Sequence, residues 1–167
     1  ALEAMRSHID PAGTRVLILG AGAAGRATAL ELALAGAAEI VVCDRDADRA
    51  AALVEAITGL DSAESVTIPW RAEIEIPERV GIVISAIPAD GTKPAFECLG
   101  MRNDLVVADF ALVPQPSPMI AAAVRQGACP IDGLEIHAAK TAIDFQTLTG
   151  MEVDTDMLRE ALDEYLS

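Results

Sequence analysis

The chain has 167 residues, 52% of them apolar and 23% charged, which suffices for one well-packed domain but not for two of ordinary size. It carries 12 Lys and Arg against 26 Asp and Glu, a formal charge of -14, and a chain of that sign repels phosphate backbones and anionic lipid. We therefore expect neither nucleic acid nor a membrane among its partners.

Short β-branched runs alternate with alanine- and leucine-rich segments of helical spacing, as in βαβ units on a parallel sheet. Because the strands are apolar on both faces, we expect an α/β fold with helices on each side of a mainly parallel sheet. In chain order, the pattern predicts strand Arg15–Leu19, helix Ala23–Ala35, strand Glu39–Cys43, helix Asp46–Thr58, strands Ser65–Ile68, Gly81–Ser85 and Leu105–Ala108, helix Pro118–Gln126, strand Cys129–Ile131, and helices Leu134–Leu148 and Thr155–Tyr165.

Two proline-bearing stretches, Ile87–Pro94 and Val113–Pro118, directly follow predicted strands, where ligand-binding loops lie in an open parallel sheet. The segment from Asp144 to Ser167 holds seven carboxylates and one basic residue, Arg159. That charge pattern indicates a solvated outer helix.

The three cysteines, Cys43, Cys98 and Cys129, are far apart and form no CxxC motif or Cys/His cluster. This spacing fits neither a disulfide framework nor a zinc site. We expect no metal, and we expect reduced, buried thiols in a cytoplasmic protein. The first residues do not form the apolar core of a signal peptide, and the longest apolar runs are only of strand length.

A glycine-rich segment, Gly20-Ala21-Gly22-Ala23-Ala24-Gly25, follows the first predicted strand and opens the first predicted helix. The second strand leads into Asp44, 19 residues past Gly25, and this context makes the GxGxxG pattern specific for a dinucleotide-binding, Rossmann-type fold. Gly20 permits a tight turn, Gly22 lets the backbone approach a pyrophosphate, and Gly25 lets the helix pack on the strand. Helix-start amides receive the negative charge, so an acidic chain can still bind a dinucleotide. A helix–strand contact without a ligand is the disfavoured alternative.

Asp44 and its neighbours bear on the choice of cofactor. A carboxylate here accepts the ribose hydroxyls of NAD and repels the 2′-phosphate of NADP, whereas Arg45 could clamp that phosphate or stack on adenine. Because Asp44 and Asp46 flank Arg45, the sequence favours NAD and leaves NADP open. As an alternative to a cofactor contact, Arg45 and Arg49 could simply be solvated at the start of the Asp46–Thr58 helix.

From Gly13 to about Leu162, the sequence resembles the C-terminal cofactor-binding domain of the shikimate/quinate dehydrogenases. The most diagnostic feature is an Asp-Gly-Leu turn before a helix that ends in Thr-Gly, because it is no general Rossmann feature. The likeness rests on VLILGAGAAGRATALELALAGAAEIVVCDRDADRA, on SAIPADG after the fourth strand, on ADFALVPQPSP after the fifth, and on Asp132-Gly133-Leu134 leading through Phe145 to Leu148-Thr149-Gly150.

The resemblance implies an oxidoreductase of aromatic amino acid biosynthesis that moves a hydride between NAD(P) and a secondary alcohol of a small cyclic hydroxy acid of the 3-dehydroshikimate/shikimate type. The family usually has Asn-Arg-Thr where this chain has Asp44-Arg45-Asp46, which agrees with NAD. The implied cofactor contacts are Gly20, Ala21, Gly22, Ala23 and Ala24 on the pyrophosphate, Asp44, Arg45, Asp46 and Arg49 at the adenosine ribose, Phe110 and Gly133 against the nicotinamide half, and Ser85, Ala86, Ile87 and Pro88 beneath it.

On the substrate side, this chain departs from the family. Leu112 replaces a usual Tyr and cannot hydrogen-bond a hydroxyl, and Lys140 replaces a substrate-binding Gln and would bring a positive charge toward a carboxylate or phosphate. The substrate therefore need not be shikimate. Solvation explains Lys140 equally well, because His137, Lys140 and Asp144 share one polar helix stripe. No second catalytic group accompanies His137, so we expect it to have no catalytic role.

The family's proton-transferring Lys–Asp pair and most of its substrate pocket lie in an N-terminal domain, for which the 19 residues before Gly20 leave no room. The resemblance thus implies that residues 1–167 form one cofactor-binding domain without catalytic residues, whose partner is the N-terminal domain of the same protein. Ala1–His8 would end the helix that connects the two domains. The isolated chain should bind cofactor without turnover.

Alternatives to this interpretation stay open. One is another Rossmann enzyme with a changed substrate, such as a glutamyl-tRNA reductase-like or methylene-tetrahydrofolate dehydrogenase-like protein, although the Asp132–Gly150 segment argues against both. The other is a non-catalytic dinucleotide-sensing module, which would explain Leu112 and Lys140. The sequence does not give the oligomeric state, and a homodimer stays open.

Overall fold

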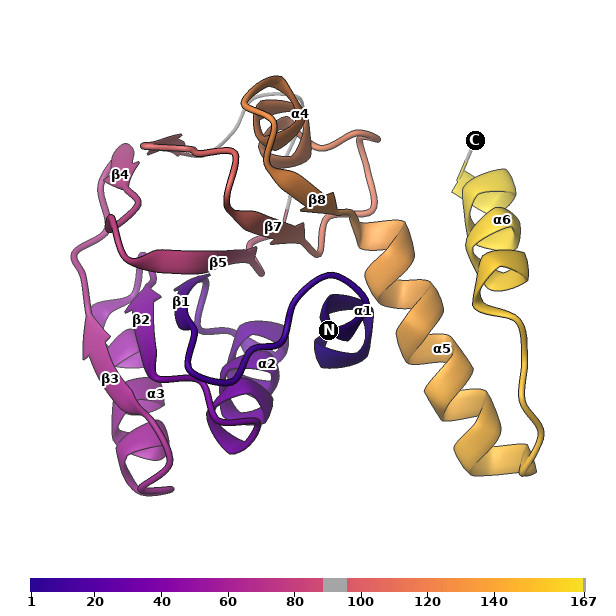
Figure 1. Cartoon of the computed structure of the whole chain (residues 1–167), viewed down its shortest axis with the longest axis horizontal. Coiled ribbons are helices and arrows are strands. Elements are labelled where there is room, and N and C mark those ends of the chain that lie inside the picture. Colours follow the sequence, from indigo (N-terminus) through magenta and orange to yellow (C-terminus); the bar gives the residue numbers. More distant parts are fainter. Residues whose placement is uncertain (89–95, 167) are drawn as a thin grey trace.

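The computed structural model describes residues 1–88 and 96–166. At its centre lies a six-stranded sheet in the order β3-β2-β1-β5-β7-β8, in which all neighbouring strands are parallel (Figure 1). This order joins two βαβ halves at β1 and β5 and confirms the Rossmann-type α/β prediction. The strands are β1 (Arg15–Leu19), β2 (Glu39–Cys43), β3 (Glu64–Thr67), β5 (Val80–Ser85), β7 (Val106–Asp109) and β8 (Cys129–Ile131).

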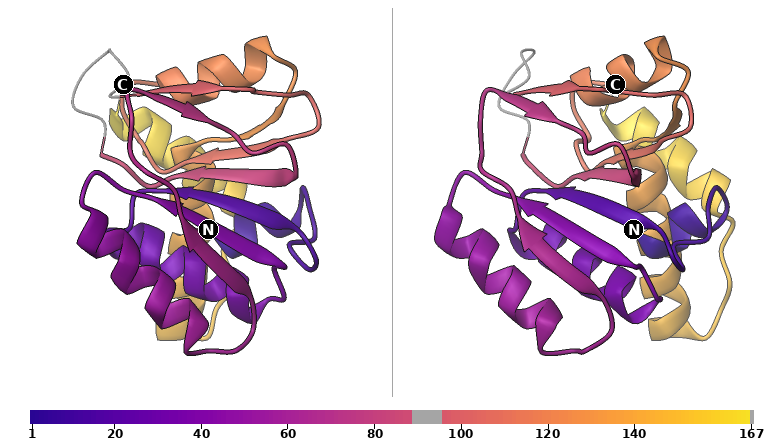
Figure 2. Two further views of the ribbon diagram at one scale, coloured as in Figure 1. Left: turned by 90° about the vertical axis from the view of Figure 1, so that its left-hand side faces the viewer. Right: turned by 60° about the vertical axis from the view of Figure 1, so that its left-hand side comes forward.

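Helices α1, α2, α3 and α5 cover one face of the sheet (Figure 2). Alternate strand residues such as Val16 and Ile18 pack with these helices in one buried cluster. Leu32 of α2 and Leu53 of α3 are fully buried there. The helices of the chain are α1 (Leu2–Arg6), α2 (Ala23–Leu34), α3 (Ala47–Thr58), α4 (Pro118–Arg125), α5 (Gly133–Thr149) and α6 (Thr155–Leu166).

The opposite face also carries a helix, α4, as predicted, together with a small sheet that the sequence pattern did not predict. Leu17 and Leu19 point to this face and pack in a second cluster with Met119 of α4. The rest of the cover is a small parallel sheet of β4 (Glu73–Glu75) and β6 (Glu97–Leu99). One helix and two short strands therefore cover this face.

The predicted elements agree closely with the structure. Strands β1, β2 and β8 have the predicted bounds, and the other predicted strands and helices differ by one residue at one or both ends. The sequence pattern missed β4 and β6, because each has three residues, and in β4 only Ile74 is buried between two exposed glutamates. The short helix α1 lies within the segment that the resemblance predicted to be helical.

The C-terminal helix α6 lies on the outside of the molecule beside α5 and has no buried residue, as the charge pattern predicted (Figure 1). All three cysteines are free, but only Cys43 is buried. Cys98 and Cys129 are partly exposed, so the prediction of three buried thiols was wrong for these two. In the part of the chain that the structure describes, every helix is too short or too polar to cross a bilayer.

Candidate functional site

The glycine loop lies where the two halves of the sheet meet. Strand β1 pairs with β2 on one side and with β5 on the other, so its carboxyl end is the topological switch point of the sheet. Gly20 N–H donates to Cys43 O at 2.8 Å, and Ala86 N–H donates to Leu19 O at 2.8 Å. The segments that follow β1, β2 and β5 therefore meet at one edge of the sheet.

At the three glycines of the loop, an added side chain would have different consequences. Gly20 has a φ of +97°, and an added Cβ would lie 3.0 Å from Ala86 O. At Gly25, an added Cβ would lie 1.8 Å from Gly20 O, so only glycine lets α2 approach the loop this closely. Gly22 has a φ of -69°, and an added Cβ there would meet no protein atom within 4 Å. The space over Gly22 is open, which fits a ligand that approaches the backbone.

The first turn of α2 is left without a side-chain cap. Helices α3, α4 and α5 are preceded by the cap residues Asp46, Ser117 and Asp132, whose side chains accept hydrogen bonds from first-turn amides. The cap residue of α2 is Gly22, which has no side chain to do so. Ala23 and Ala24 are exposed at this helix start. The unpaired amides and the positive end of the helix dipole suit a pyrophosphate.

The Asp44 carboxylate joins the end of β2 to the glycine loop. One oxygen accepts from Ala21 N–H at 2.6 Å, and the other accepts from Asp46 N–H at 2.8 Å. The side chain is half-buried beside the start of α2. A carboxylate held in this orientation can accept the ribose hydroxyls of an adenosine and repels a phosphate on the same ribose.

Arg45 and Arg49 have different partners. The Arg45 guanidinium lies over the indole of Trp70, 5.2 Å from the ring centroid, and Trp70 makes an edge contact with Phe96. Arg49 pairs with Asp46 across one helical turn, at 3.5 Å. Sequence reasoning missed Trp70, although a lone tryptophan shortly after β3 is a signal for a stacking group at this edge.

The segment Ser85–Pro88 starts at the last residue of β5 and lies next to the glycine loop. Ser85 is 4% exposed and ends β5, and Ala86 and Ile87 contact the position of Gly20 where its Cβ would be. Ala89, Asp90 and Gly91, which complete the SAIPADG motif, lie outside the described residues.

Asp109, at the end of β7, shapes the next loop. Its carboxylate accepts from Ser117 Oγ at 2.6 Å and from Ala111 N–H at 3.2 Å, which secures the segment between β7 and α4. Burial raises the pKa of Asp109, although these hydrogen bonds and one from Ser85 act to lower it. The buried carboxyl group therefore positions Phe110, the next residue, at the edge of the site.

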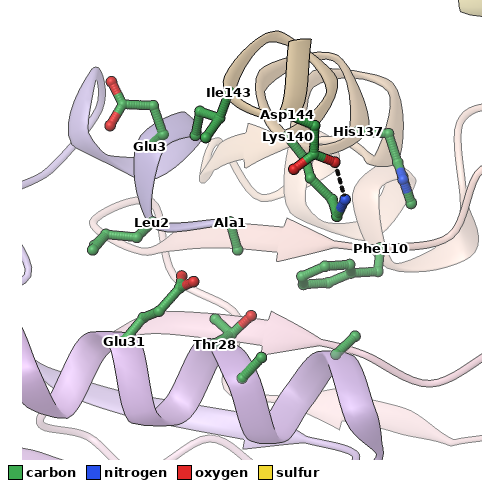
Figure 3. Close-up of a pocket in the computed structure, with 12 residues that line it drawn as sticks. Ala1, Leu2, Glu3, Thr28, Glu31, Phe110, His137, Lys140, Ile143 and Asp144 are labelled. Carbon is green, nitrogen blue, oxygen red and sulfur yellow. Dashed lines mark hydrogen bonds and ion pairs between the residues drawn. The ribbon is translucent and has the colours of Figure 1, made fainter. Parts of the chain in front are cut away.

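A pocket of about 580 Å³ opens between α1, α2 and α5 (Figure 3). It begins at Ala24, in the first turn of α2, and continues past Phe110, whose ring contacts His137 edge to face. Sequence reasoning missed the contribution of α1 and of the exposed face of α2, because neither carries a motif. The lining residues are Ala1, Leu2, Glu3, Ala24, Ala27, Thr28, Glu31, Phe110, His137, Lys140, Ile143 and Asp144.

Of the two predicted substrate residues, only Lys140 lines this pocket. Its ammonium pairs with Asp144 one turn along α5 (Figure 3), and its side chain is 65% exposed. Leu112 is half-buried and is not among the described residues that line the pocket. As far as the chain is described, the pocket lining has one lysine, Lys140, and three carboxylates, those of Glu3, Glu31 and Asp144.

Gly133 and Asp132 begin α5. A Cβ on Gly133 would lie 2.2 Å from Ala111 O, so glycine is needed for α5 to reach the segment after β7. Asp132 caps the helix at Glu135 N–H and forms two hydrogen bonds with the Arg159 guanidinium, at 2.8 and 2.6 Å. Partial burial acts to raise the pKa of Asp132, but the bonds from Arg159 and Glu135 N–H outweigh it, so the pKa is lowered.

The Shikimate / quinate 5-dehydrogenase family model matches residues 3–97 of the chain. The curated shikimate dehydrogenase (NADP(+)) of Methanopyrus kandleri is 34% identical over 179 residues, which cover 99% of this chain and 60% of the relative. The chain thus spans about 60% of the length of such a curated relative.

Solved structures show the same architecture. The ligand-free 5-ketofructose reductase of Gluconobacter sp. strain CHM43 superposes with a TM-score of 0.92 at 30% identity, over 97% of this chain and 60% of that one. Quinate dehydrogenase from Corynebacterium glutamicum, in complex with NAD, superposes with a TM-score of 0.78 at 26% identity, over 94% and 57%. Since the family model covers more than half of the sequence, the chain belongs to the shikimate/quinate 5-dehydrogenase family.

Proposed function

We propose that the chain is the dinucleotide-binding domain of an NAD(P)-dependent oxidoreductase that acts on a secondary alcohol. The observation that carries this proposal is the uncapped start of α2 at Gly22, where the space over the backbone is open. Next to it, the Asp44 carboxylate, which follows β2, is hydrogen-bonded to Ala21 N–H of the same loop. Amides for a pyrophosphate and an acceptor for a ribose are thereby held together.

The proposed cofactor contacts follow the edge of the sheet. The Gly20–Gly25 loop holds the pyrophosphate, and Asp44 accepts hydrogen bonds from the adenosine ribose. Asp46 and Arg49, paired with each other, flank that ribose. The nicotinamide half extends over Ser85–Pro88 toward Phe110 and the start of α5 at Gly133. When bound there, the nicotinamide supplies or takes up the hydride.

We propose NAD as the preferred cofactor, although the curated relative is named for NADP(+). Asp44 brings a negative charge to the ribose, and its orientation is fixed by two backbone amides. Arg45, the residue that could pair with a 2′-phosphate, lies over Trp70 instead. A phosphate on that ribose would face the Asp44 carboxylate, which would repel it.

The substrate class that the family supports is a small cyclic hydroxy acid. Lys140, on the pocket wall, is the proposed partner for its carboxylate. Leu112 lies outside the lining of this pocket and offers the substrate no hydrogen bond. The proton-transferring groups and the rest of the substrate pocket lie, in this proposal, in an N-terminal domain of the same protein. The cofactor-binding domain orients the nicotinamide toward them.

A second candidate is an uncharged keto sugar. The observation that favours it is the charge of the pocket, where Lys140 already pairs with Asp144 and two more carboxylates line the wall. Such a wall disfavours an anionic substrate, and the 5-ketofructose reductase of Gluconobacter superposes with a TM-score of 0.92. Leu112 and Lys140, where the family usually has Tyr and Gln, agree with a changed substrate.

An assay with the full-length protein tests the proposal. Shikimate and quinate are offered with NAD and NADP, and 5-ketofructose with NADH and NADPH, while absorbance of the reduced nicotinamide is followed. Turnover of an acid supports the first candidate, and turnover of the sugar alone supports the second. If the protein binds NAD but reduces or oxidises none of these, the non-catalytic module is supported instead.

A further inference from the structure

A cysteine, a histidine and a glutamate come together outside the dinucleotide site. His8 follows α1, Cys129 begins β8, and Glu135 lies in the first turn of α5. Figure 1 shows α1 next to α5, and β8 leads directly into α5. None of the three residues lines the pocket described above.

The His8 imidazole lies between the carboxylate of Glu135 and the thiol of Cys129. His8 Nε2 lies 2.7 Å from Glu135 Oε1, and His8 Nδ1 lies 3.5 Å from Cys129 Sγ. Because an ionised carboxylate can only accept, a neutral His8 carries its hydrogen on Nε2. Its Nδ1 lone pair then faces the thiol of Cys129, which donates to it.

This is the arrangement of a nucleophile, a base and a group that orients the base. Transfer of the thiol proton to His8 would produce a thiolate beside an imidazolium, and the Glu135 carboxylate would stabilise that cation. The His8 and Glu135 side chains are each 29% exposed, so water screens their interaction only in part. Cys129 itself is partly exposed and within reach of a small reagent.

The other two thiols lie in a different environment from Cys129. Burial raises the pKa of Cys43 to about 11 and the pKa of Cys98 to about 12, and neighbouring negative groups add to both shifts. Both thiols therefore stay protonated near neutral pH, and a protonated thiol is a poor nucleophile. Cys129 differs from them because it faces an imidazole.

We propose that Cys129 is a site of thiol–disulfide exchange with low-molecular-weight disulfides, with His8 as the base and Glu135 as the positioning residue. His8 takes the thiol proton, and the Cys129 thiolate attacks one sulfur of the disulfide. A new S–S bond forms to Cys129 as the original S–S bond breaks. Cys129 is oxidised, the departing sulfur is reduced to a thiolate, and the proton passes from His8 to that thiolate or to water.

The test uses the native chain and dipyridyl disulfide, an uncharged probe that the net charge of -14 does not repel. Release of pyridinethione gives the rate, and peptide mapping by mass spectrometry assigns the modified cysteine. We expect Cys129 to react at least about tenfold faster than Cys98 and Cys43, and Cys129→Ser to remove the fast phase. Fastest reaction at Cys98 or Cys43 would overturn the proposal.

Variants distinguish activation of the Cys129 thiol by His8 from a fast reaction that results only from its exposure. His8→Asn should slow Cys129 by about tenfold or more, since a positioned base contributes at least that much. Glu135→Gln should slow the reaction of Cys129 less. Because this variant retains His8, it still tests the proposal if His8→Asn does not fold. The matched control is His137→Asn, which changes the other histidine of the chain and should leave the rate unchanged. An unchanged Cys129 rate in a folded His8→Asn or Glu135→Gln variant contradicts the assignment.

Discussion

The Asp44 carboxylate accepts a hydrogen bond of 2.6 Å from the backbone N–H of Ala21, and this bond joins the end of β2 to the loop after β1. The same carboxylate accepts from Asp46 N–H. The group proposed to select the cofactor therefore also holds the loop proposed to bind it. Substitutions at this edge should separate the two roles.

The first prediction compares two glycines of the loop. Gly22→Ala should leave the free energy of unfolding nearly unchanged, because the added Cβ meets no protein atom within 4 Å, yet it should weaken cofactor binding at least about tenfold. Gly25→Ala should destabilise the fold by about 3 kcal/mol or more, because its Cβ would overlap Gly20 O. Urea unfolding and calorimetric titration measure the two effects. Undiminished affinity in Gly22→Ala would mean that no ligand occupies that space.

The second prediction concerns Asp44. Asp44→Asn keeps an acceptor for Ala21 N–H but removes the charge, so the ratio of NADP to NAD affinity should rise by about tenfold or more. Asp48→Asn is the matched control, because it makes the same charge change at an exposed residue of the next helix. Titration with both cofactors gives the ratio. An equal change in the two variants would attribute the effect to net charge alone.

The third prediction concerns pH and the attachment of α6. The folded-state pKa of Asp132 is lowered below its ordinary value of 3.8, so its contribution to stability is present above pH 3.8 and is lost as the pH falls through the folded-state pKa. Arg159→Gln should cost about 1 kcal/mol at pH 7, because the Arg159 side chain is 38% exposed, and less near pH 3. Urea unfolding at several pH values measures this. The exposed pair of Arg6 and Glu3 supplies the control, and Arg6→Gln should cost less at pH 7.

The fourth prediction concerns the buried carboxyl group of Asp109. Its pKa is raised on folding, so its contribution favours the folded state most at low pH and declines as the pH rises through the folded-state pKa. Asp109→Ala should cost about 2–3 kcal/mol, because it leaves Ser117 Oγ and Ala111 N–H without their acceptor. Thermal unfolding compares it with Asp109→Asn, which keeps an acceptor and should cost less. Equal losses of stability in Asp109→Ala and Asp109→Asn would show that these hydrogen bonds do not account for the contribution of Asp109.

The sequence predicted the elements of the main sheet and the glycine loop because their causes are local. A buried strand, three glycines and an acid at the end of the next strand are neighbours along the chain. Asp132 was recognised as part of a motif, but its role as a cap with a bidentate partner was not, because Arg159 is 27 residues away. The same holds for Trp70 under Arg45 and for the walls of the pocket. These contacts form only when the tertiary packing is complete.

The most direct test of the central claim is a calorimetric titration of the 167-residue chain with NAD and with NADP. We expect one cofactor site per chain, with NAD bound at least about tenfold more tightly than NADP. We also expect Gly22→Ala to weaken the binding of both cofactors. No heat with either cofactor at saturating concentration would contradict the assignment of the α2 start as a dinucleotide site, and tighter binding of NADP would contradict the role given to Asp44.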